Sequence, residues 1–391
     1  AYRAPGATPT AFSVESVVDD LARSLSIDPM EFRLRNVSRP GDPMPDGDLL
    51  TSVNFTEVLN RVKQHDCWTT PLEGKNRGRG LALGMWTMPG GSASCHVNLN
   101  GDGSVTLVLG TPDLSGTRTS LGLVAAEALG LALSDVKVTI ANTDAVAYSD
   151  ASAGDRITYI ASIAVGRACA SLIESMKARV ASEFDTSPEH IGYCEGRFAA
   201  SGVPEMSVSW EAMALRSVRG DGALSASGVA SEIPDGAAIA PNATAHVVDV
   251  EVDPETGKVD LLRYTTFQDA GLAVNPAQVE GQMQGGATQG IGWALSEGYD
   301  YDEDGRLQNA TLLDYRLPTS MDVPFIDTEI IEIPSEAHPL GIRAVGQAPI
   351  VPPAGAIANA IYNAVGVRMR QLPMKPETVY LAIRDSESQQ R

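Results

Sequence analysis

The sequence predicts an α+β fold built from two similar modules, each a β-hairpin followed by a helix and a further strand. Three observations support this prediction. Alternating apolar and polar residues flank turn sequences at Gly101, Asp102 and Gly103 and at residues 254–257, which is the pattern of two hairpins. Stretches with apolar residues at helical spacing follow both hairpins. Because the same order occurs twice along one chain, we expect a duplicated α+β module.

The N-terminal stretch, residues 1–77, predicts a helical segment followed by a connector. Behind a proline, apolar side chains recur at helical spacing, at Val14, Val17, Val18, Leu21 and Leu25. Asp28, Pro29 and Glu31 have the order of a capping box, so we expect a second short helix to begin there. Residues 39–52 are rich in Pro, Gly and Asp and predict a connector.

Residues 78–232 form the first predicted module and residues 246–391 the second, with a linker rich in Ala, Pro and Gly at residues 233–245. In the first module, a helix over residues 120–129 and a strand over residues 133–142 follow the hairpin. A loop then leads into a long helix. The first module therefore ends in a second, longer helical stretch.

The second module repeats this order and adds two helices. Its hairpin is followed by a helix over residues 278–295 and by strands around Asn309 and Ile330. Two further helices are predicted over residues 353–365 and 376–384, each beginning with a proline.

The composition narrows the classes of function. The chain has 391 residues, of which 43% are hydrophobic, and a formal net charge of −20. An acidic surface repels nucleic-acid phosphates, so we expect no nucleic-acid partner. No apolar run approaches the length of a membrane span and no signal peptide is recognisable. We therefore expect no membrane partner and a cytoplasmic location.

The residue pattern gives little support to metal or disulfide chemistry. The four cysteines, Cys67, Cys95, Cys169 and Cys194, form no CxxC pair, which argues against a zinc site, an iron–sulfur cluster or a disulfide framework and favours small buried side chains. The stretch YDEDGRLQ, residues 301–308, has acids like those of a calcium loop, but its glycine is misplaced. A hairpin turn is therefore the favoured interpretation of this stretch.

The glycine-rich stretch GQMQGGATQGIG, residues 281–292, has two open interpretations. It fails as a dinucleotide fingerprint because no hydrophobic strand leads into it. Its glycines would serve either close helix packing or the close approach of a ligand to the backbone.

Three loops, residues 1–6, 148–156 and 344–353, are rich in small residues and proline and lead toward helix N-termini. Loops of this kind present backbone N–H groups that suit an anionic ligand. We therefore expect a sizeable cofactor that carries phosphate.

Five stretches, in this order along the chain, resemble a known family. They are AYRAPGATPTAFSVESVVDDLARSLSIDPMEFRLRN, GDGSVTLVLGTPDLSGTRTS, AAEALGLALSDVKVTIANTDA, NPAQVEGQMQGGATQGIGWAL and AVGQAPIVPPAGAIANAI. Together they resemble the C-terminal half of the molybdopterin-binding (large) subunit of the xanthine dehydrogenase and aldehyde oxidase family of molybdenum hydroxylases. The resemblance implies that the two α+β modules correspond to the molybdopterin-binding domains of that family.

The resemblance also implies a molybdopterin cofactor with molybdenum, with the cytosine dinucleotide form left open, and no protein side chain as a direct metal ligand. It assigns cofactor contacts to Arg3, Ala4, Ser115, Gly116, Thr117, Ala153, Gly154, Gln282 and Gly346. Ser115 and Gly116 stand where many members have a GQG-type motif, so the glutamine contact of that motif is lost. Pro5 replaces an aromatic residue that holds flat substrates in other members, and Pro5 and Trp86 are the expected substrate contacts.

The last of the five stretches departs from the family at one position. The family's Val-Gly-Glu motif supplies a carboxylate base, whereas this chain has Val345, Gly346 and Gln347. An amide cannot accept the proton, and general-base catalysis contributes about 10²–10⁴-fold. Three explanations stay open: an engineered Glu-to-Gln change that traps a substrate complex, a natural variant with different chemistry or with its base elsewhere, and a degenerate subunit.

Asp155 is the alternative base that the sequence offers. It directly follows the Ala153–Gly154 pair, which the resemblance places beside the metal and the pterin. The simpler role for Asp155, and the favoured one, is to cap the long helix that begins there.

The resemblance finally implies partners and a reaction. The N-terminal half of the molybdenum subunit, an iron–sulfur subunit and a FAD subunit would be separate chains. Together they would oxidise an aldehyde or an N-heteroaromatic carbon with water as the oxygen source, and the electrons would leave through the iron–sulfur and flavin subunits. The alternative function is a degenerate structural or interaction subunit, or an inactivated Glu-to-Gln form, that binds the cofactor without turnover.

Overall fold

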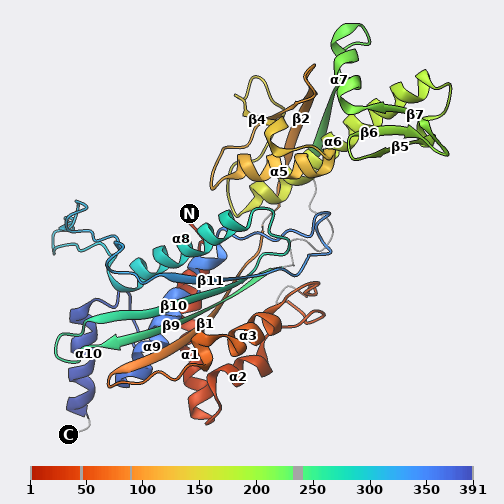
Figure 1. Ribbon diagram of the computed structural model, residues 1–391. Helices are drawn as coiled ribbons and strands as arrows, with labels where there is room; N and C mark the ends of the chain where they lie inside the picture. Colours follow the sequence, from red (N-terminus) through yellow and green to blue (C-terminus); the bar gives the residue numbers. More distant parts are fainter. Residues whose placement is uncertain (1, 45–46, 89, 232–240, 390–391) are drawn as a thin grey trace. The chain divides into compact units, whose positions relative to one another are not determined.

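The computed structural model describes residues 2–44, 47–88, 90–231 and 241–389. Its contacts divide the chain into two compact units, which Figure 1 shows in sequence colours. Over these residues, unit 1 is built from Ala1–Thr87, Ile239–Glu336 and Leu340–Arg391, and unit 2 from Met88–Ala238 and Ala337–Pro339. The predicted linker, residues 233–245, lies mostly outside the described residues.

A mixed four-stranded sheet forms the centre of unit 1. Its strands have the order β1 (Arg77–Trp86), β9 (Asn242–Val252), β10 (Val259–Asp269) and β11 (Ile326–Ile331). Strands β1, β9 and β10 pair antiparallel, and β11 pairs with β10 in parallel. A parallel neighbour requires a crossover connection, which here contains helix α8 (Pro276–Leu295).

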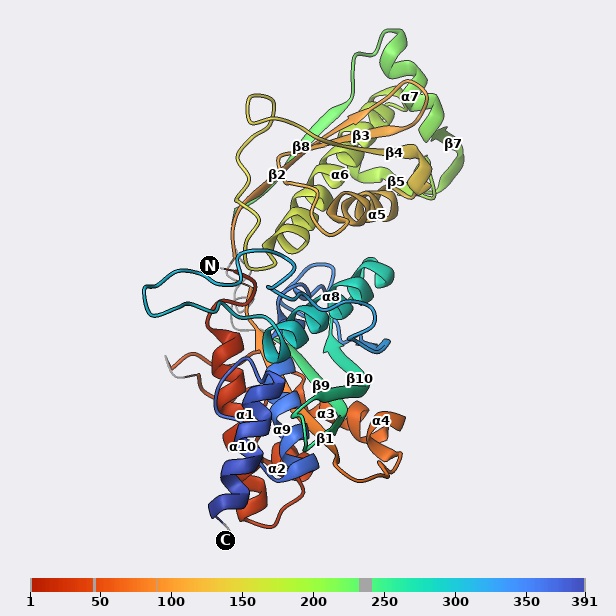
Figure 2. The same ribbon diagram turned by 90° about the vertical axis from the view of Figure 1, so that its left-hand side faces the viewer.

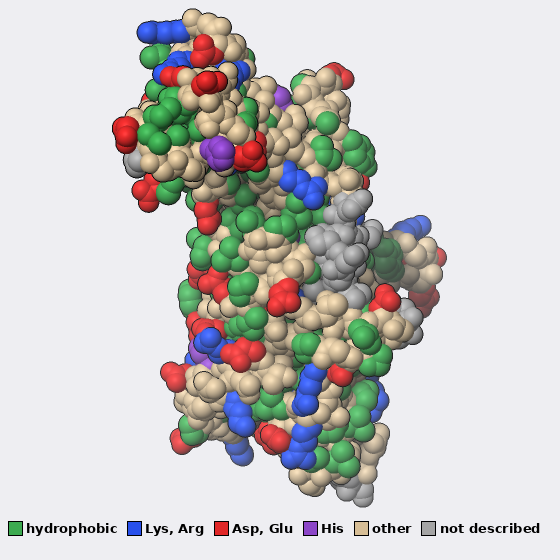
Figure 3. All heavy atoms as spheres, turned by 90° about the vertical axis from the view of Figure 1, so that its right-hand side faces the viewer, with side chains coloured by type: hydrophobic (Ala, Val, Ile, Leu, Met, Phe, Trp, Pro, Cys, Tyr) green, Lys and Arg blue, Asp and Glu red, His purple; other side chains and the backbone are tan. Residues whose placement is uncertain are grey.

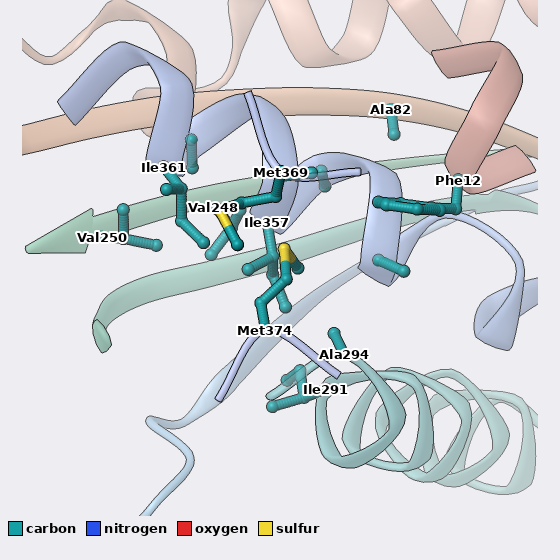
Figure 4. Close-up of a cluster of buried hydrophobic side chains, with 14 of the residues drawn as sticks. Phe12, Ala82, Val248, Val250, Ile291, Ala294, Ile357, Ile361, Met369 and Met374 are labelled. Atoms are coloured by element: carbon teal, nitrogen blue, oxygen red, sulfur yellow. The ribbon is translucent and has the colours of Figure 1, made fainter. Parts of the chain in front are cut away.

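Helices pack on both faces of this sheet. The core on one face takes in α9 (Pro353–Val365), α1 (Ala7–Ser24), α8 and α10 (Pro376–Gln389). The core on the other face takes in α2 (Pro29–Asn36), α3 (Phe55–Gln64) and the short α4 (Asp66–Thr69). Figure 4 shows the first core, where Val248 of β9, Ile291 of α8 and Ile357 of α9 point toward one another.

Strand β9 is buried along almost its whole length, so its polar side chains need internal partners. His246 has no exposed surface, and its ring nitrogens lie 2.8 Å from the hydroxyl oxygens of Tyr264 and Thr266. Burial lowers the pKa of His246 to about 3, because desolvation disfavours the charged imidazolium. His246 is therefore a neutral structural histidine.

Glycine in a strand lets a helix lie directly on the sheet. A Cβ atom added at Gly80 of β1 would lie 2.0 Å from the carbonyl oxygen of Ala356 in α9. Unit 2 has the same arrangement, because a Cβ atom at Gly228 of β8 (Ser225–Ala230) would lie 2.1 Å from the carbonyl oxygen of Ala164 in α6 (Arg156–Glu183). A larger residue at either position would separate helix from strand.

Unit 2 has its own four-stranded sheet, in the order β4 (Val136–Ile140), β3 (Val105–Leu109), β2 (Ala93–Leu99) and β8 (Ser225–Ala230). Helices α5 (Thr117–Leu129) and α6 (Arg156–Glu183) pack against each other and against this sheet (Figure 2). A small three-stranded sheet and a helix follow: β5 (Ile191–Cys194), β6 (Arg197–Ala200), β7 (Val203–Ser209) and α7 (Trp210–Arg219).

The predicted order of hairpin, helix and strand occurs in both units. It is β2, β3, α5 and β4 in unit 2 and β9, β10, α8 and β11 in unit 1. In each case the last strand pairs in parallel with the second strand of the hairpin. The mixed α and β class is therefore confirmed, while a duplication of one module stays a prediction.

The contacts group the chain differently from the predicted boundaries. Strand β1, expected in the module at residues 78–232, pairs antiparallel with β9 and so belongs to unit 1. The helical segment at residues 1–77 joins the same unit and is not a separate body. The sequence pattern alone could not show this long-range strand pairing.

One predicted strand is wrong. Around Asn309 the described chain forms a loop, in which the Asn309 side chain accepts a hydrogen bond from Asp300 N at 3.0 Å and donates one to Gly298 O at 2.7 Å. These bonds close the loop through a side chain and leave no strand ladder. The hairpin turn predicted at residues 301–308 is confirmed by an antiparallel bridge between Tyr301 and Leu307.

Within the described part of the chain, one helix is long and apolar enough to cross a membrane. This helix is α6, and 61% of its apolar stretch is buried inside the protein. The finding corrects the sequence prediction that no run approaches such a length. Because α6 packs on β2, β8 and α5, its apolar length is explained as the core helix of unit 2.

The burial of the cysteines and the distribution of charge on one face can be compared with what the composition predicted. Cys67, Cys95 and Cys169 are buried and Cys194 is exposed, as expected for small side chains that mainly fill the core. On the face shown in Figure 3, basic side chains are interspersed with acidic and hydrophobic ones. That face has no continuous basic surface among the described residues.

Candidate functional site

The loop around Gln347, residues 344–350 and hereafter the Gln347 loop, is fixed through its backbone. Three successive carbonyl groups accept hydrogen bonds from side chains of three different segments of unit 1. These bonds run from Asn242 Nδ2 to Ala344 O, from Gln268 Nε2 to Val345 O (3.0 Å) and from Arg3 Nε to Gly346 O (2.7 Å). Because each donor comes from a different element, the loop cannot shift without breaking several bonds.

The Gln347 side chain is half-buried, and its contact to the N-terminal loop is short. Its Oε1 atom accepts a hydrogen bond from Ala4 N at 2.5 Å. Gln347 also precedes the 3-10 turn η4 (Ala348–Ile350), which is buried. A carboxylate oxygen would accept the same bond from Ala4 N, so the position suits Gln and Glu equally well in shape.

Arg3 connects three segments of unit 1. Besides Gly346 O, its guanidinium donates to Gln289 Oε1 at 3.3 Å and to Gln282 O at 3.1 Å, both in α8. A Cβ atom at Gly286 would lie 2.9 Å from the Arg3 guanidinium, so Gly286 makes room for it. The planar fork of Arg suits such multiple acceptors better than an ammonium group would.

The N-terminal loop has a constrained backbone. Ala4 is fully buried and has φ 50°, and Gly6, at the N-cap of α1, has φ 79°. Left-handed geometry at a residue with a Cβ costs on the order of 1–3 kcal/mol and is common at functional sites. The loop packs on Ile350 and Val351, with Trp86 against the same cluster. Pro5 is exposed.

Two glycines of α8 serve close helix packing, and ligand approach at the other glycines stays a prediction. Cβ atoms at Gly286 and Gly290 would lie within 3 Å of Pro349 and Pro353, so these two glycines allow close packing. Gly281 and Gly285 are exposed, and apart from the neighbouring backbone of α8 no described atom lies within 4 Å of a Cβ at either position. Gly281 and Gly285 therefore leave the α8 backbone accessible beside Gln282, which is half-buried.

A buried ion pair anchors the start of the Gln347 loop. Arg343 Nε lies 2.8 Å from Asp269 Oδ2, and the two side chains are 2% and 0% exposed. Asp269 also accepts hydrogen bonds from Asn54 Nδ2 at 2.7 Å and from Gly271 N at 3.0 Å. Burial raises the pKa of Asp269, and the positive charge of Arg343 opposes that rise.

The loop before α5 in unit 2 holds three of the predicted cofactor residues. Ser115 and Gly116 both have left-handed backbones, with φ 56° and 77°, directly before α5. Thr117 is buried, and its hydroxyl donates to Leu114 O at 2.6 Å. Thr111, two residues before Asp113, has a buried hydroxyl oxygen for which the described residues provide no partner.

The loop before α6 shows a second pair of left-handed residues, Gly154 (φ 62°) and Asp155 (φ 67°). Ala153 is exposed and Gly154 is buried. Asp155 stands at the N-cap position of α6, as predicted, but its side chain makes no capping hydrogen bond among the described residues. The expectation that the Asp155 carboxylate caps this helix is therefore wrong, because its left-handed backbone differs from the extended conformation of capping residues.

A second carboxylate in this loop is Asp150, which the sequence analysis did not single out. It accepts hydrogen bonds from Ser92 N at 2.5 Å and from the Tyr148 hydroxyl at 2.8 Å, and Arg156 lies 3.7 Å away. These hydrogen bonds lower the pKa of Asp150. Asp150 is therefore a structural acceptor that fixes its loop.

Most of the predicted residues of unit 1 are brought together. Arg3, Ala4, Gln282, Gly346 and Gln347 are joined by direct hydrogen bonds. The other predicted cofactor residues lie in the two loops of unit 2 just described. Within the described residues, no three His, Cys, Asp or Glu side chains form a metal-binding group.

Sequence reasoning missed Asn242 and Gln268, the amides that fix the Gln347 loop. Both lie in buried strands, where a polar side chain must have a partner. An amide in a strand of otherwise buried residues was the available signal. Gln268 Oε1 is also buried without a partner among the described residues.

Comparison with known families gives a clear match. The molybdopterin cofactor-binding domain matches residues 49–324, and a second match to the same kind of domain covers residues 1–37. The chain is 32% identical over 400 residues to a xanthine dehydrogenase molybdenum-binding subunit of Escherichia coli O157:H7, covering 97% of this chain and 53% of that protein. It is 30% identical to the nicotine 6-hydroxylase large subunit of Paenarthrobacter nicotinovorans, covering 98% and 50%.

Solved structures show the same fold. Quinoline 2-oxidoreductase from Pseudomonas putida 86 matches with a TM-score of 0.85 and 25% identity, over 98% of this chain and 53% of that one. Aldehyde oxidoreductase from Desulfovibrio gigas matches with a TM-score of 0.79 and 25% identity, over 98% and 42%. The chain thus spans about half the length of the relatives it matches, and the match covers their C-terminal part.

Proposed function

This chain belongs to the molybdopterin cofactor-binding family of molybdenum oxidoreductase subunits, and we propose that it forms the C-terminal part of the catalytic molybdenum subunit in a multi-subunit hydroxylase or dehydrogenase. The observation that supports this most directly is the Gln347 loop. Its backbone is fixed by three side chains, and its tip presents residue 347 next to Ala4 and Arg3. Such preorganisation is typical of catalytic loops.

The residues present fit the cofactor. Gln268 Oε1 and Thr111 Oγ1 are buried acceptors without partners in the described chain, and each adjoins a predicted cofactor loop. Gly281 and Gly285 leave the α8 backbone open. We propose that the following residues hold the cofactor: Arg3, Ala4, Gln282 and Gly346 in unit 1, and Ser115, Gly116, Thr117, Ala153 and Gly154 in unit 2. When bound, the cofactor supplies the redox chemistry that oxidises a carbon with oxygen from water.

Gln347 can form hydrogen bonds in the site but cannot act as a base. Its amide oxygen is held by Ala4 N, and an amide cannot accept the proton that a carboxylate would. If the reaction needs a general base, another group must provide it, and Asp155 is the candidate that we propose. The absence of a base at residue 347 is also the observation that favours the second function, a subunit that binds the cofactor without turnover.

We further propose the partners and the reaction that the family resemblance implies. The substrate would be an aldehyde or an N-heteroaromatic ring, by analogy with relatives named nicotine 6-hydroxylase and aldehyde oxidoreductase. Electrons would pass to iron–sulfur and FAD subunits, and the N-terminal part of the molybdenum subunit would come from another polypeptide. Pro5 and Trp86 would contact the substrate. The complex would be cytoplasmic, and a module duplication would explain the repeated topology.

Purification of the chain with its natural partners tests the proposal. We expect stoichiometric molybdenum and pterin in the complex, measured by metal analysis and by fluorescence of the oxidised pterin. A complex without either would refute the proposed function. Turnover of aldehydes, purines and N-heteroaromatics, compared between the wild type and Gln347→Glu, then separates the two functions. Activity in the wild type supports a catalytic subunit, whereas activity only in Gln347→Glu supports the cofactor-binding subunit without turnover.

A further inference from the structure

Four large aliphatic residues on helix α1 and directly after it are exposed. Val14, Val17, Leu21 and Leu25 recur at helical spacing and are 49%, 56%, 48% and 59% exposed. We call these four residues the α1 stripe. Their spacing predicted a helix, and such a stripe normally packs into a core. In unit 1 it lies on the outer side of α1, which Figure 2 shows beside α9.

The buried side of α1 carries charged residues instead. Glu15 is 7% exposed and Asp19 is 2% exposed. Glu15 Oε2 accepts hydrogen bonds from Arg33 Nη2 at 2.8 Å and from Leu83 N at 2.9 Å. Asp19 pairs at 3.0 Å with both Arg23 and Arg368. The buried side of α1 thus holds two paired acids beside the core residue Phe12, while four large aliphatic side chains are exposed.

These polar contacts fix the rotation of α1. A Cβ atom at Gly355 in α9 would lie 3.0 Å from Glu15 Cβ, so the two helices are in close contact. Phe12, on the same side as Glu15, belongs to the core of unit 1. Turning α1 to bury the stripe would break the buried ion pairs, which is strongly destabilising. The outward direction of the stripe is therefore built into unit 1.

The family match suggests what covers the stripe. Residues 1–37, which include α1 and α2, match a cofactor-binding domain separately from residues 49–324. A stretch of 37 residues is smaller than a domain with its own core, which usually has about 50 residues or more. The relatives are about twice as long as this chain, and the chain matches their C-terminal part. The remaining part of the first domain would then lie in the N-terminal part of the subunit.

We propose that the α1 stripe is the docking surface for the polypeptide that carries the N-terminal part of the molybdenum subunit. This inference rests on the proposed function and adds the surface at which that partner binds. The partner would present an aliphatic groove or helix face. Because the four stripe residues are uncharged, their association with the partner should depend little on salt.

The test measures binding between this chain and that N-terminal polypeptide, produced from the same genome. Binding is followed by titration calorimetry for the wild type and for the double variant Val17→Gln/Leu21→Gln. Gln keeps a good helix propensity, and both side chains are about half exposed, so the variant should melt with the wild type. We expect the variant to bind roughly 30-fold more weakly, from the loss of two half-buried aliphatic contacts.

Leu381→Gln provides the matched control, because Leu381 is a 51% exposed leucine on α10 of the same unit. Its dissociation constant should equal that of the wild type. Val14→Thr, which keeps the side-chain shape, should weaken binding a few-fold and serves if the double variant fails to fold.

Three outcomes would overturn the inference. If the double variant binds as tightly as the wild type, the partner docks elsewhere and the proposed function stands. If sedimentation shows that the wild type self-associates through the stripe and the variant does not, the occupant is a second copy. If the wild type does not bind the N-terminal polypeptide at all, the proposed division of the subunit fails, and this inference fails with it.

Discussion

Arg343→Met should destabilise unit 1 strongly, because it leaves a buried carboxylate without its counter-charge. Both side chains of the Arg343–Asp269 pair are almost fully buried, with the nearest N and O atoms 2.8 Å apart. Charge centres about 4 Å apart interact by roughly 4 kcal/mol at an effective dielectric constant of about 20. Removing one partner of a buried pair costs about 3–5 kcal/mol. We therefore expect the free energy of unfolding to fall by about 4 kcal/mol at pH 7.

The loss of stability caused by Arg343→Met should be smaller at low pH than at high pH. Burial already raises the pKa of Asp269, and removal of Arg343 removes the charge that opposes this rise. Because the folded-state pKa then lies further above the unfolded-state value, the variant regains stability as the pH falls and loses it as the pH rises. The double variant Arg343→Met/Asp269→Asn should recover more than half of the loss at pH 7.

Urea unfolding at pH 7 and pH 5 measures these effects in the wild type and the two variants. A loss below about 1 kcal/mol for Arg343→Met at pH 7 would show that the pair does not hold the fold. An equal loss at both pH values would show that Asp269 does not carry the effect. Either result would refute the argument.

Three further perturbations have expected outcomes. Burial lowers the pKa of His246 from 6.5 to about 3, so below pH 6.5 this residue binds more protons in the unfolded state than in the folded state. The free energy of unfolding should therefore fall by up to about 1.4 kcal/mol for each unit by which the pH is lowered. Equal stability in urea at pH 6.5 and pH 5 would contradict this. Gly80→Ala should cost about 3 kcal/mol, because its Cβ would lie 2.0 Å from a backbone oxygen of α9. Gly166→Ala should instead stabilise α6 by up to about 1 kcal/mol, because apart from the neighbouring backbone of α6 no described atom lies within 4 Å of its Cβ. Similar melting temperatures for the two variants would refute the packing argument. Arg3→Lys keeps the charge but loses the fork that reaches three acceptors, and it should lower the free energy of unfolding by about 1–2 kcal/mol; a variant that unfolds with the wild type would show that these bonds contribute nothing.

Local signals in the sequence predicted the local structure well. Asp28 caps α2 through hydrogen bonds from Met30 N and Glu31 N, as its position before Pro29 suggested. The hairpins and the helices that follow them also lie where alternation and helical spacing placed them. These features depend on contacts between residues close in sequence, so a single chain contains the information that determines them.

The sequence pattern could not predict features that depend on contacts between residues far apart in the chain. The pattern of α1 predicted a helix correctly but could not show which side faces the core. That side is set by two ion pairs to residues outside α1: Glu15 pairs with Arg33 of α2, and Asp19 pairs with Arg368, far along the chain. For the same reason Asn242 was not recognised as a support of the Gln347 loop. Its role depends on a hydrogen bond to a residue 102 positions away.

The position of residue 347 is determined by its loop and not by its own side chain. The carbonyl groups before it are held by Asn242, Gln268 and Arg3, and none of these bonds involves the residue 347 side chain. The hydrogen bond that the residue 347 side chain accepts from Ala4 N suits an amide or a carboxylate oxygen. An exchange between Glu and Gln therefore changes the proton chemistry of the site by removing or restoring a base, while the fold that aims the side chain is unchanged. Fold and chemistry at this position can therefore vary independently.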